Sequence, residues 1–243
     1  PPPGGEQGLR DAFKAAMAAP ITAYKPDAVK PWPYTDFGKP GVVATRELVS
    51  DLNVTKVVYE NGVKLTIKPL PTNKDLISVR VRMGWGRLQM PINVIDASDM
   101  GLSLWSSGGL NKLTVTEQSR TLAGKRAAAV ARTLDDAYSL DNLNVATRED
   151  FPLQMQLMAA MITDSAYRAD DWASWMAAAD ASDASLKLTP SGVLERELDQ
   201  LLHSGDLRWT INTKAQRDSW KPEDSVKYIK PIVDNSPIEV IVI

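Results

Sequence analysis

An Asn-Gly pair between two apolar, alternating runs constrains this chain more than any other feature of its sequence. The pair lies in VYENGVKLTIKP, at residues 58–69. Asn61 and Gly62 are the preferred residues of a type I′ turn, because both central positions of that turn need a positive φ. After the turn, three apolar side chains alternate with polar ones: Val63, Leu65 and Ile67. The pattern predicts an antiparallel hairpin that opens the folded body and faces these three side chains inward.

A second alternating run, LISVRVRMG at residues 76–84, predicts a strand that is buried on one face. Its apolar face comprises Ile77, Val79, Val81 and Met83. Ser78, Arg80 and Arg82 lie on the opposite face, where the two arginines are candidates for holding an anionic ligand. The alternative is that they form the solvated face of a half-buried sheet.

Helical patterns follow the second run. The sequence predicts helices over 95–107 and over 113–125, and the second of them closes at a glycine. The Ala-rich stretch 125–146 fits either a helix or strands by its periodicity. We interpret it as two strands, because a pair of turn-favouring aspartates divides it.

Three further helices are predicted between residues 147 and 205. The first begins at Thr147 or Asp150, and its apolar stripe comprises Phe151, Met155, Met158 and Ile162. The second carries Trp172, Trp175 and Met176. The third has Thr189 as its N-cap and ends at Gly205. Its apolar stripe comprises Val193, Leu194, Leu198, Leu201 and Leu202. We interpret the methionine and tryptophan stripes as parts of a hydrophobic core.

The order of the predicted elements indicates the fold class. A short helix near 222–229 and an apolar C-terminal strand complete the order ββ(β), αα, ββ, ααα, α, β. Hairpins and helices that come in blocks are typical of the α+β class, in which helices cover one face of a mostly antiparallel sheet. The closing run PIEVIVI leads us to expect that the chain is a piece of a longer polypeptide.

The N-terminal part differs in composition, so we divide the chain into a Pro-rich strap or linker (1–44) and an α+β body (45–243). Eight of the sixteen prolines lie within residues 1–40. Leu9, Phe13 and Met17 recur there at a spacing of four, which predicts a short helix that Pro20 stops.

The extended stretch at residues 24–41 follows this helix. It carries Trp32, Tyr34 and Phe37, and such aromatic side chains favour a strap that lies on a surface over a disordered tail.

Residue counts exclude much catalytic chemistry. The chain has no cysteine, which excludes disulfides and thiolate sites, and its one histidine is His203, interpreted as a helix C-terminal residue near free carbonyls. No HxxxH, GxSxG or Walker-type spacing is present, and Ser106–Gly109 is interpreted as a helix end. A net charge of −2 and the lack of a long apolar run predict neither a nucleic-acid partner nor a membrane span.

Taken in order, these segments resemble the opening of a lobe of the M16 zinc metallopeptidases, the family of pitrilysin, insulinase and mitochondrial processing peptidase. The resemblance covers roughly residues 45–243. It is carried by TKVVYENGVKLTIKPL, LISVRVRMGWGR, a helix ending in Gly-Gly, LNVATREDFPLQMQLMAAMITDSAYRADDW, LLHSGDLRW and SPIEVIVI. The Pro-rich approach resembles the second half of a long bacterial member of the PqqL-like kind, so residues 1–44 would come from a preceding lobe.

The sequence departs from the family at the zinc motif. Catalytic lobes carry His-x-x-Glu-His on the helix that here reads NVIDASDMGLSLWSSGG. Aligned on the closing glycines, the two histidine positions fall near Asp99–Met100 and Ser103–Leu104, and the glutamate position near Leu102–Ser103. These residues do not rebuild a site in which two histidines hold zinc and a glutamate activates water. We therefore expect no catalytic and no metal-binding residue in this chain.

The resemblance implies a non-catalytic lobe of a zinc peptidase whose catalytic half holds the zinc. Such a lobe would form a wall of a clamshell chamber around a peptide substrate, with the catalytic lobe as its partner and the periplasm as its location. Arg80, Arg82 and Arg87 are the candidate substrate contacts. Two alternatives stay open: a scaffold lobe of a parent that has lost proteolysis, and an enzyme with an unrecognised site.

Overall fold

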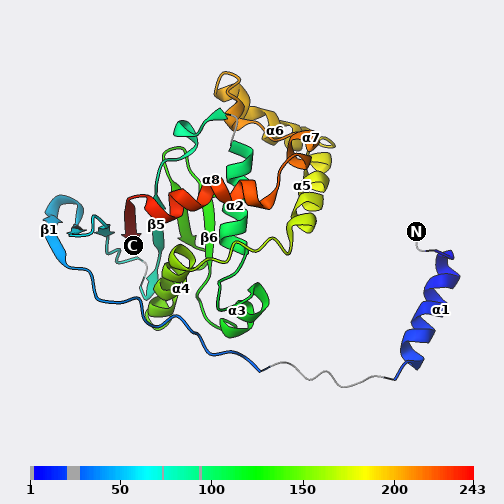
Figure 1. Cartoon of the computed structure of the whole chain (residues 1–243), viewed down its shortest axis with the longest axis horizontal. Helices are drawn as coiled ribbons and strands as arrows, with labels where there is room; N and C mark the ends of the chain where they lie inside the picture. Colours follow the sequence, from blue (N-terminus) through cyan, green and yellow to red (C-terminus); the bar gives the residue numbers. More distant parts are fainter. Residues whose placement is uncertain (1–2, 21–27, 73, 93–94) are drawn as a thin grey trace.

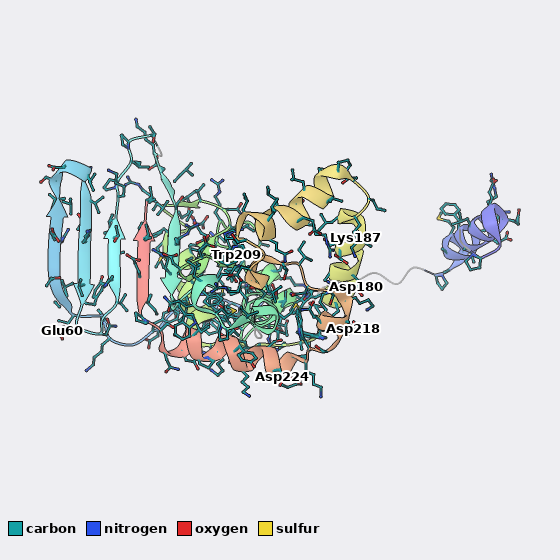
Figure 2. The ribbon with its side chains drawn as sticks, turned by 90° about the horizontal axis from the view of Figure 1, so that it is seen from above. Glu60, Asp180, Lys187, Trp209, Asp218 and Asp224 are labelled. Atoms are coloured by element: carbon teal, nitrogen blue, oxygen red, sulfur yellow. The ribbon has the colours of Figure 1, made fainter. Side chains whose placement is uncertain are left out.

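A seven-stranded sheet organises the protein. The structure is a computed structural model that describes residues 3–20, 28–72, 74–92 and 95–243, except for the side chains of 95–98. The strand order is β1-β2-β3-β9-β5-β7-β6, and all neighbours are antiparallel except β3 and β9 (Figure 2). The strands are β1 (Val43–Val49), β2 (Val54–Tyr59), β3 (Lys64–Ile67), β5 (Val79–Met83), β6 (Ala129–Thr133), β7 (Tyr138–Asn142) and β9 (Ile238–Val242). The prediction of a mostly antiparallel sheet is confirmed.

The hairpin of β2 and β3 is present, but its turn is not the predicted one. Its loop holds three residues, Glu60 to Gly62, and the Gly62 N–H donates to the Tyr59 carbonyl at 2.9 Å. Gly62 has a φ of 86°, whereas Asn61 is not among the residues with a positive φ. A three-residue loop that ends in a left-handed glycine also suits the twist of a hairpin. The predicted hairpin is confirmed and the predicted type I′ turn is wrong.

The sequence does not predict β1, which forms one edge of the sheet. Its sequence, VATRELV, lacks the alternation of polar and apolar residues that marks a strand with one buried face. In the structure six of its seven side chains are exposed and Val49 is half-buried. β1 also runs across residue 44, where the sequence divides strap from body. In Figure 1, β1 extends beyond the helices that cover the rest of the sheet. A two-stranded sheet of β4 (Leu76–Ile77) and β8 (Ala146–Thr147) is likewise absent from the predicted order.

Helices α2 (Ile95–Ser107) and α8 (Pro222–Asn235) cover one face of the sheet (Figure 1). The core beneath them includes the predicted apolar face of β5: Val79, Val81 and Met83. Trp105 of α2 is buried, and its Nε1–H donates to the Met161 carbonyl at 2.6 Å. The two helices approach closely at Gly101, where a Cβ would lie 2.4 Å from the Ser225 carbonyl oxygen. Helices on one face of this sheet confirm the α+β class.

Two predicted elements hold with changed detail. The two strands expected in 125–146 are β6 and β7, and residues 135–136 lie between them. The helix expected over 113–125 is shorter, because α3 (Val115–Thr121) begins at a capping box made by Thr114 and Glu117.

Helix α4 (Phe151–Thr163) lies where predicted, with a rotated buried face. Its buried residues are Gln154, Leu157, Met158, Ala160 and Met161. Three residues of the predicted stripe are half-buried and flank the core instead: Phe151, Met155 and Ile162. The helix carries apolar side chains on most of its circumference, so periodicity alone does not decide which side faces the core.

Helices α5 (Trp172–Leu186), α6 (Pro190–Leu202) and α7 (Lys214–Asp218) form a group on the side of the body opposite β1 (Figure 2). The core role predicted for three α5 side chains is wrong: Trp172, Trp175 and Met176 are half-buried and lie outside the described hydrophobic core. They lie on a helix that packs mainly on α6 and α7. The sequence does not predict α7, which has only five residues.

Helix α8 is longer than the helix predicted near 222–229. It continues through Pro231 to Asn235. Ile229, Ile232 and Val233 are buried on both sides of this proline. Their burial stabilises the helix beyond a residue that removes one of its backbone donors.

The N-terminal helix is confirmed as α1 (Gly5–Ala18), followed by extended backbone before Pro20. It has no buried residue and lies away from the body in both figures. Residues 21–27, which include the start of the predicted strap, lie outside the described residues. Within the described part of the chain, no helix is long and apolar enough to cross a membrane.

The described part of the strap contacts the body through Tyr34. Its side chain is buried, and its hydroxyl donates to Asp164 Oδ2 at 2.8 Å and accepts from the Lys112 N–H at 3.0 Å. Trp32 packs against the core and Phe37 is exposed. The strap thus joins the core at one buried aromatic residue.

Candidate functional site

Helix α2 occupies the place at which the zinc motif of the resembled family would fall. Leu102 and Leu104 are buried in the apolar layer between α2 and its neighbours. The Ser103 hydroxyl donates to the backbone carbonyl of Asp99 at 3.2 Å. Leucine side chains offer no ligand atom, and a hydroxyl bound to its own helix is a poor one. The residues at these positions do not fit a zinc site, so no chemical step is derived through a metal here.

Asp99, a polar residue of α2, lies beside β6 and η2 (Arg87–Gln89). Its Oδ1 accepts a hydrogen bond from the Thr133 hydroxyl at 2.9 Å, and its Oδ2 lies 3.6 Å from Arg87. Burial raises the pKa of Asp99 above the ordinary range, and Arg87 and Thr133 offset only part of this rise. Asp99 is therefore a carboxyl group held in a partly apolar setting by one hydroxyl and one guanidinium.

Asp99 opens onto a hollow of about 590 Å³ between α2, β6 and the α5–α7 group, here called the helical cleft. Its lining includes Arg87, Asp99, Met100, Thr133, Asp183, Leu186, Arg196, Trp209, Ile211, Arg217 and Trp220. Trp209, labelled in Figure 2, ends η4 (Leu207–Trp209), between the sheet and the helical group. Both charged and aromatic side chains thus line the cleft.

Ion pairs link helices α5, α6 and α7 on the helical side of this cleft. Arg196 of α6 donates to Asp183 of α5, and Lys187 also contacts Asp183 at 2.7 Å. Arg217 of α7 contacts Asp180 of α5 at 2.5 Å. These cations hold the pKa of both aspartates below the usual range: Lys187 contributes most at Asp183, and Lys214 contributes most at Asp180. A cleft of mutually paired charges suits the binding of a polar chain better than nucleophilic or acid–base chemistry.

The three arginines chosen from the sequence do not converge on one site. Arg80 makes a two-pronged contact with Asp141 across the β5–β7 pair, at 2.7 and 2.9 Å. Arg82 contacts Asp136 at 2.7 Å and Glu239 at 3.5 Å. Each of the three lines a different hollow, and only Arg87 faces the helical cleft.

Sequence reasoning missed several charged residues that line these hollows. Arg132 of β6, on the open face of the sheet, also lies 3.5 Å from Asp141, which therefore binds two arginines. The Arg196–Asp183 pair joins two helices whose packing the sequence does not reveal. One available clue was the position of Arg196, on the side of its helix opposite the leucine stripe.

His203 lies at the C-terminal end of α6, as predicted. Its Nδ1 lies 2.6 Å from the Asp199 carbonyl, and its ring stacks on Trp209 with centroids 4.0 Å apart. Among the described side chains, no group of three histidine, cysteine, aspartate or glutamate residues is placed to hold a metal ion.

Comparisons by sequence identify no relative. No family model matches the sequence, and no curated protein matches it significantly.

Comparison by structure shows which proteins share the fold. The ferredoxin protease FusC, solved as a mutant in complex with Arabidopsis ferredoxin, matches all of this chain with a TM-score of 0.69 and 14% identity. The periplasmic protease PqqL from Escherichia coli matches 98% of it with a TM-score of 0.65 and 15% identity. A protease from Helicobacter pylori matches 83% of it with a TM-score of 0.60 and 15% identity.

These matches differ greatly in length from the chain. It covers 26% of the FusC chain and 26% of the PqqL chain, and 46% of the protease from Helicobacter pylori. At such low identity the likeness concerns the fold, not the reaction. The chain therefore has an α+β fold that is also found in about a quarter of the length of two proteases.

Proposed function

We propose that this chain is a non-catalytic lobe of an M16-like zinc peptidase and forms part of the wall of a chamber that encloses a peptide. Its fold, shared with a quarter of two much longer proteases, supports a peptidase-related lobe. The observation that carries the non-catalytic role is the set of side chains that α2 presents where the zinc motif would fall. Leu102 and Leu104 pack into the core there, and Asp99 is bound by Thr133.

The proposal assigns the chemistry to another part of the parent protein. The catalytic half would hold the zinc and activate water, and this lobe would confine the peptide and support that half. The helical cleft, with Arg87 and its aromatic walls, is the surface of this chain best suited to peptide contact. The periplasm is the proposed location, by analogy with PqqL.

The test compares peptide cleavage and zinc content for three preparations: this chain, the rest of its parent polypeptide, and their mixture. We expect the chain alone to be inert and free of stoichiometric zinc, and the mixture to cleave faster than the rest alone. In the mixture, Asp99→Asn should leave kcat within about twofold, because the chemistry lies in the catalytic half, and any effect should fall on KM, since Asp99 lines the helical cleft.

Each alternative has its own outcome. A mixture that assembles but never cleaves would support a scaffold lobe instead. Turnover by the isolated chain, lost in Asp99→Asn, would place an active site in the helical cleft and overturn the proposal.

A further inference from the structure

Helix α6 presents its apolar side to solvent. Leu194, Leu198 and Leu201 share one side at helical spacing, and Leu194 and Leu201 are 58% and 76% exposed. Val193 and Leu202 flank this row and are also exposed. Such an amphipathic helix normally buries its apolar stripe against its own domain. The leucine face, defined as these five residues, is therefore turned outward.

The opposite side of α6 is built to pack on α5. Gly192 is buried there, and a Cβ at this position would lie 2.3 Å from the Leu186 carbonyl oxygen at the end of α5. The Thr189 side chain caps the helix by accepting from the Gly192 N–H at 3.1 Å. A larger residue would force the two backbones apart, so sterics set which side of α6 meets α5.

Electrostatics sets the same orientation. Arg196 lies on the inner side with Gly192 and reaches Asp183, which is largely buried. Rotating α6 to bury its leucines would expose this pair and remove the contact. The outward leucine face is therefore a consequence of two specific contacts, not of loose packing.

The leucine face is hollowed and carries an acidic residue at its edge. A groove of about 520 Å³ runs along it, lined by Leu194, Leu198, Leu201 and Glu197 among others. Glu195 and Asp199 of the same helix line the helical cleft instead, so Glu197 is the charged residue of the groove lining. An occupant of this groove must offer an apolar surface with a lysine or arginine placed to meet Glu197.

The length of the matching structures indicates where such an occupant comes from. FusC contains a region that matches this chain over its full length, yet that region is 26% of the FusC chain. PqqL contains a region that matches 98% of this chain, and that region is 26% of the PqqL chain. These two proteins thus carry about three quarters of their chain outside the matched region, and a corresponding part of this chain's parent is the occupant that we consider.

We propose that the leucine face of α6 is the surface on which another lobe of the parent polypeptide docks, through an apolar patch with a basic residue at its edge. This inference rests on the proposed function in assuming a multi-lobe parent, but it names the surface that holds the lobes together. The docked lobe covers Leu194, Leu198 and Leu201, and its basic residue meets Glu197.

The test mixes the chain with the separately produced rest of the parent and measures the Kd by calorimetry. Leu201→Asp should weaken binding at least about tenfold, because it places a charge in the apolar centre of the groove. The matched control is Leu143→Asp, a leucine 61% exposed that lies outside the groove. It should leave Kd unchanged, and both variants should keep the melting midpoint of the wild type.

A thiol footprint gives an independent reading, because the chain has no cysteine of its own. The thiol of Leu201→Cys should react with a maleimide in the isolated chain. The rate of this reaction should be at least about tenfold lower in the mixture. Unchanged reactivity in a mixture that binds would overturn the inference. So would protection in the isolated chain that is lost on dilution or on deletion of residues 1–18, since a second copy or α1 would then be the occupant.

The outcomes also separate this inference from the proposed function. If the mixture cleaves peptide and Leu201→Asp binds and cleaves as the wild type does, the docking surface is wrong and the peptidase role stands. If the mixture binds through Leu201 and never cleaves, the docking surface stands and the peptidase role fails.

Discussion

Arg196 of α6 donates to Asp183 of α5, and this contact turns the polar side of α6 toward the body and its leucines toward solvent. Asp180 and Lys187, labelled in Figure 2, lie on the α5 side of the same helical group. Paired charges thus contribute to holding this group together. They make its stability dependent on pH.

The first prediction concerns the α5–α6 contact at low pH. Lys187 and Arg196 hold the pKa of Asp183 below its usual range, so its contribution to stability is present above the ordinary aspartate pKa, about 3.9. That contribution is lost as the pH falls further, through the folded-state pKa. Hydrogen exchange of the α6 amides, corrected for intrinsic rates, should show protection at pH 7 that declines below about pH 4. In Asp183→Asn the protection should be low at both pH values; a pH-dependent variant would contradict this account.

The second prediction concerns Asp99, whose pKa is shifted in the opposite direction. Burial raises its pKa, so its contribution to stability is present below the ordinary aspartate pKa and is lost as the pH rises through the folded-state value. Asp99→Asn removes the charge and keeps the shape. The variant should therefore melt higher than the wild type at pH 7, and the two should converge near pH 3.5. A lower melting midpoint at pH 7 would mean that the Arg87 contact outweighs burial.

The third prediction tests the strap. Tyr34→Phe removes the hydrogen bond to Asp164 and the one from the Lys112 N–H, and should lower the free energy of unfolding by about 1 to 3 kcal/mol in urea titrations. Burial raises the pKa of Tyr34 to about 12 and also raises the pKa of Tyr167, so both phenols should titrate late in ultraviolet spectra and the variant should lose the contribution of Tyr34. The partly exposed Tyr228→Phe serves as control and should change stability by less than about 0.5 kcal/mol.

The fourth prediction tests the close packing of α2 on α8. Gly101→Ala places a Cβ 2.4 Å from the Ser225 carbonyl oxygen, a backbone atom that moves only with its helix. The free energy of unfolding should fall by about 1 to 3 kcal/mol, although alanine favours helix formation. Ser107→Ala, an exposed position of the same helix, should be near neutral. Equal stability of both variants would show that the two helices separate at little cost.

Local patterns in the sequence determined much of the fold. The alternation in LISVRVRMG predicted the buried face of β5, and the Asn-Gly loop predicted the β2–β3 hairpin. Thr189 and Gly205 bracketed α6 correctly, because caps and breakers act within a few residues. The order of these local elements, with hairpins and helices in blocks, predicted the α+β class. Each of these inferences rests on neighbours in the chain, whose geometry the backbone itself dictates.

Only the tertiary structure decided which faces are covered and which residues meet. The leucine stripe of α6 looks like a core stripe, and it faces outward because Gly192 and Arg196 bind α5 more specifically. The chosen arginines lie in separate hollows, where each pairs with a carboxylate from a different strand, loop or helix. Edge strand β1 shows no alternation, since both of its faces meet solvent. Contacts between residues far apart in the sequence depend on packing and desolvation, which no local pattern records.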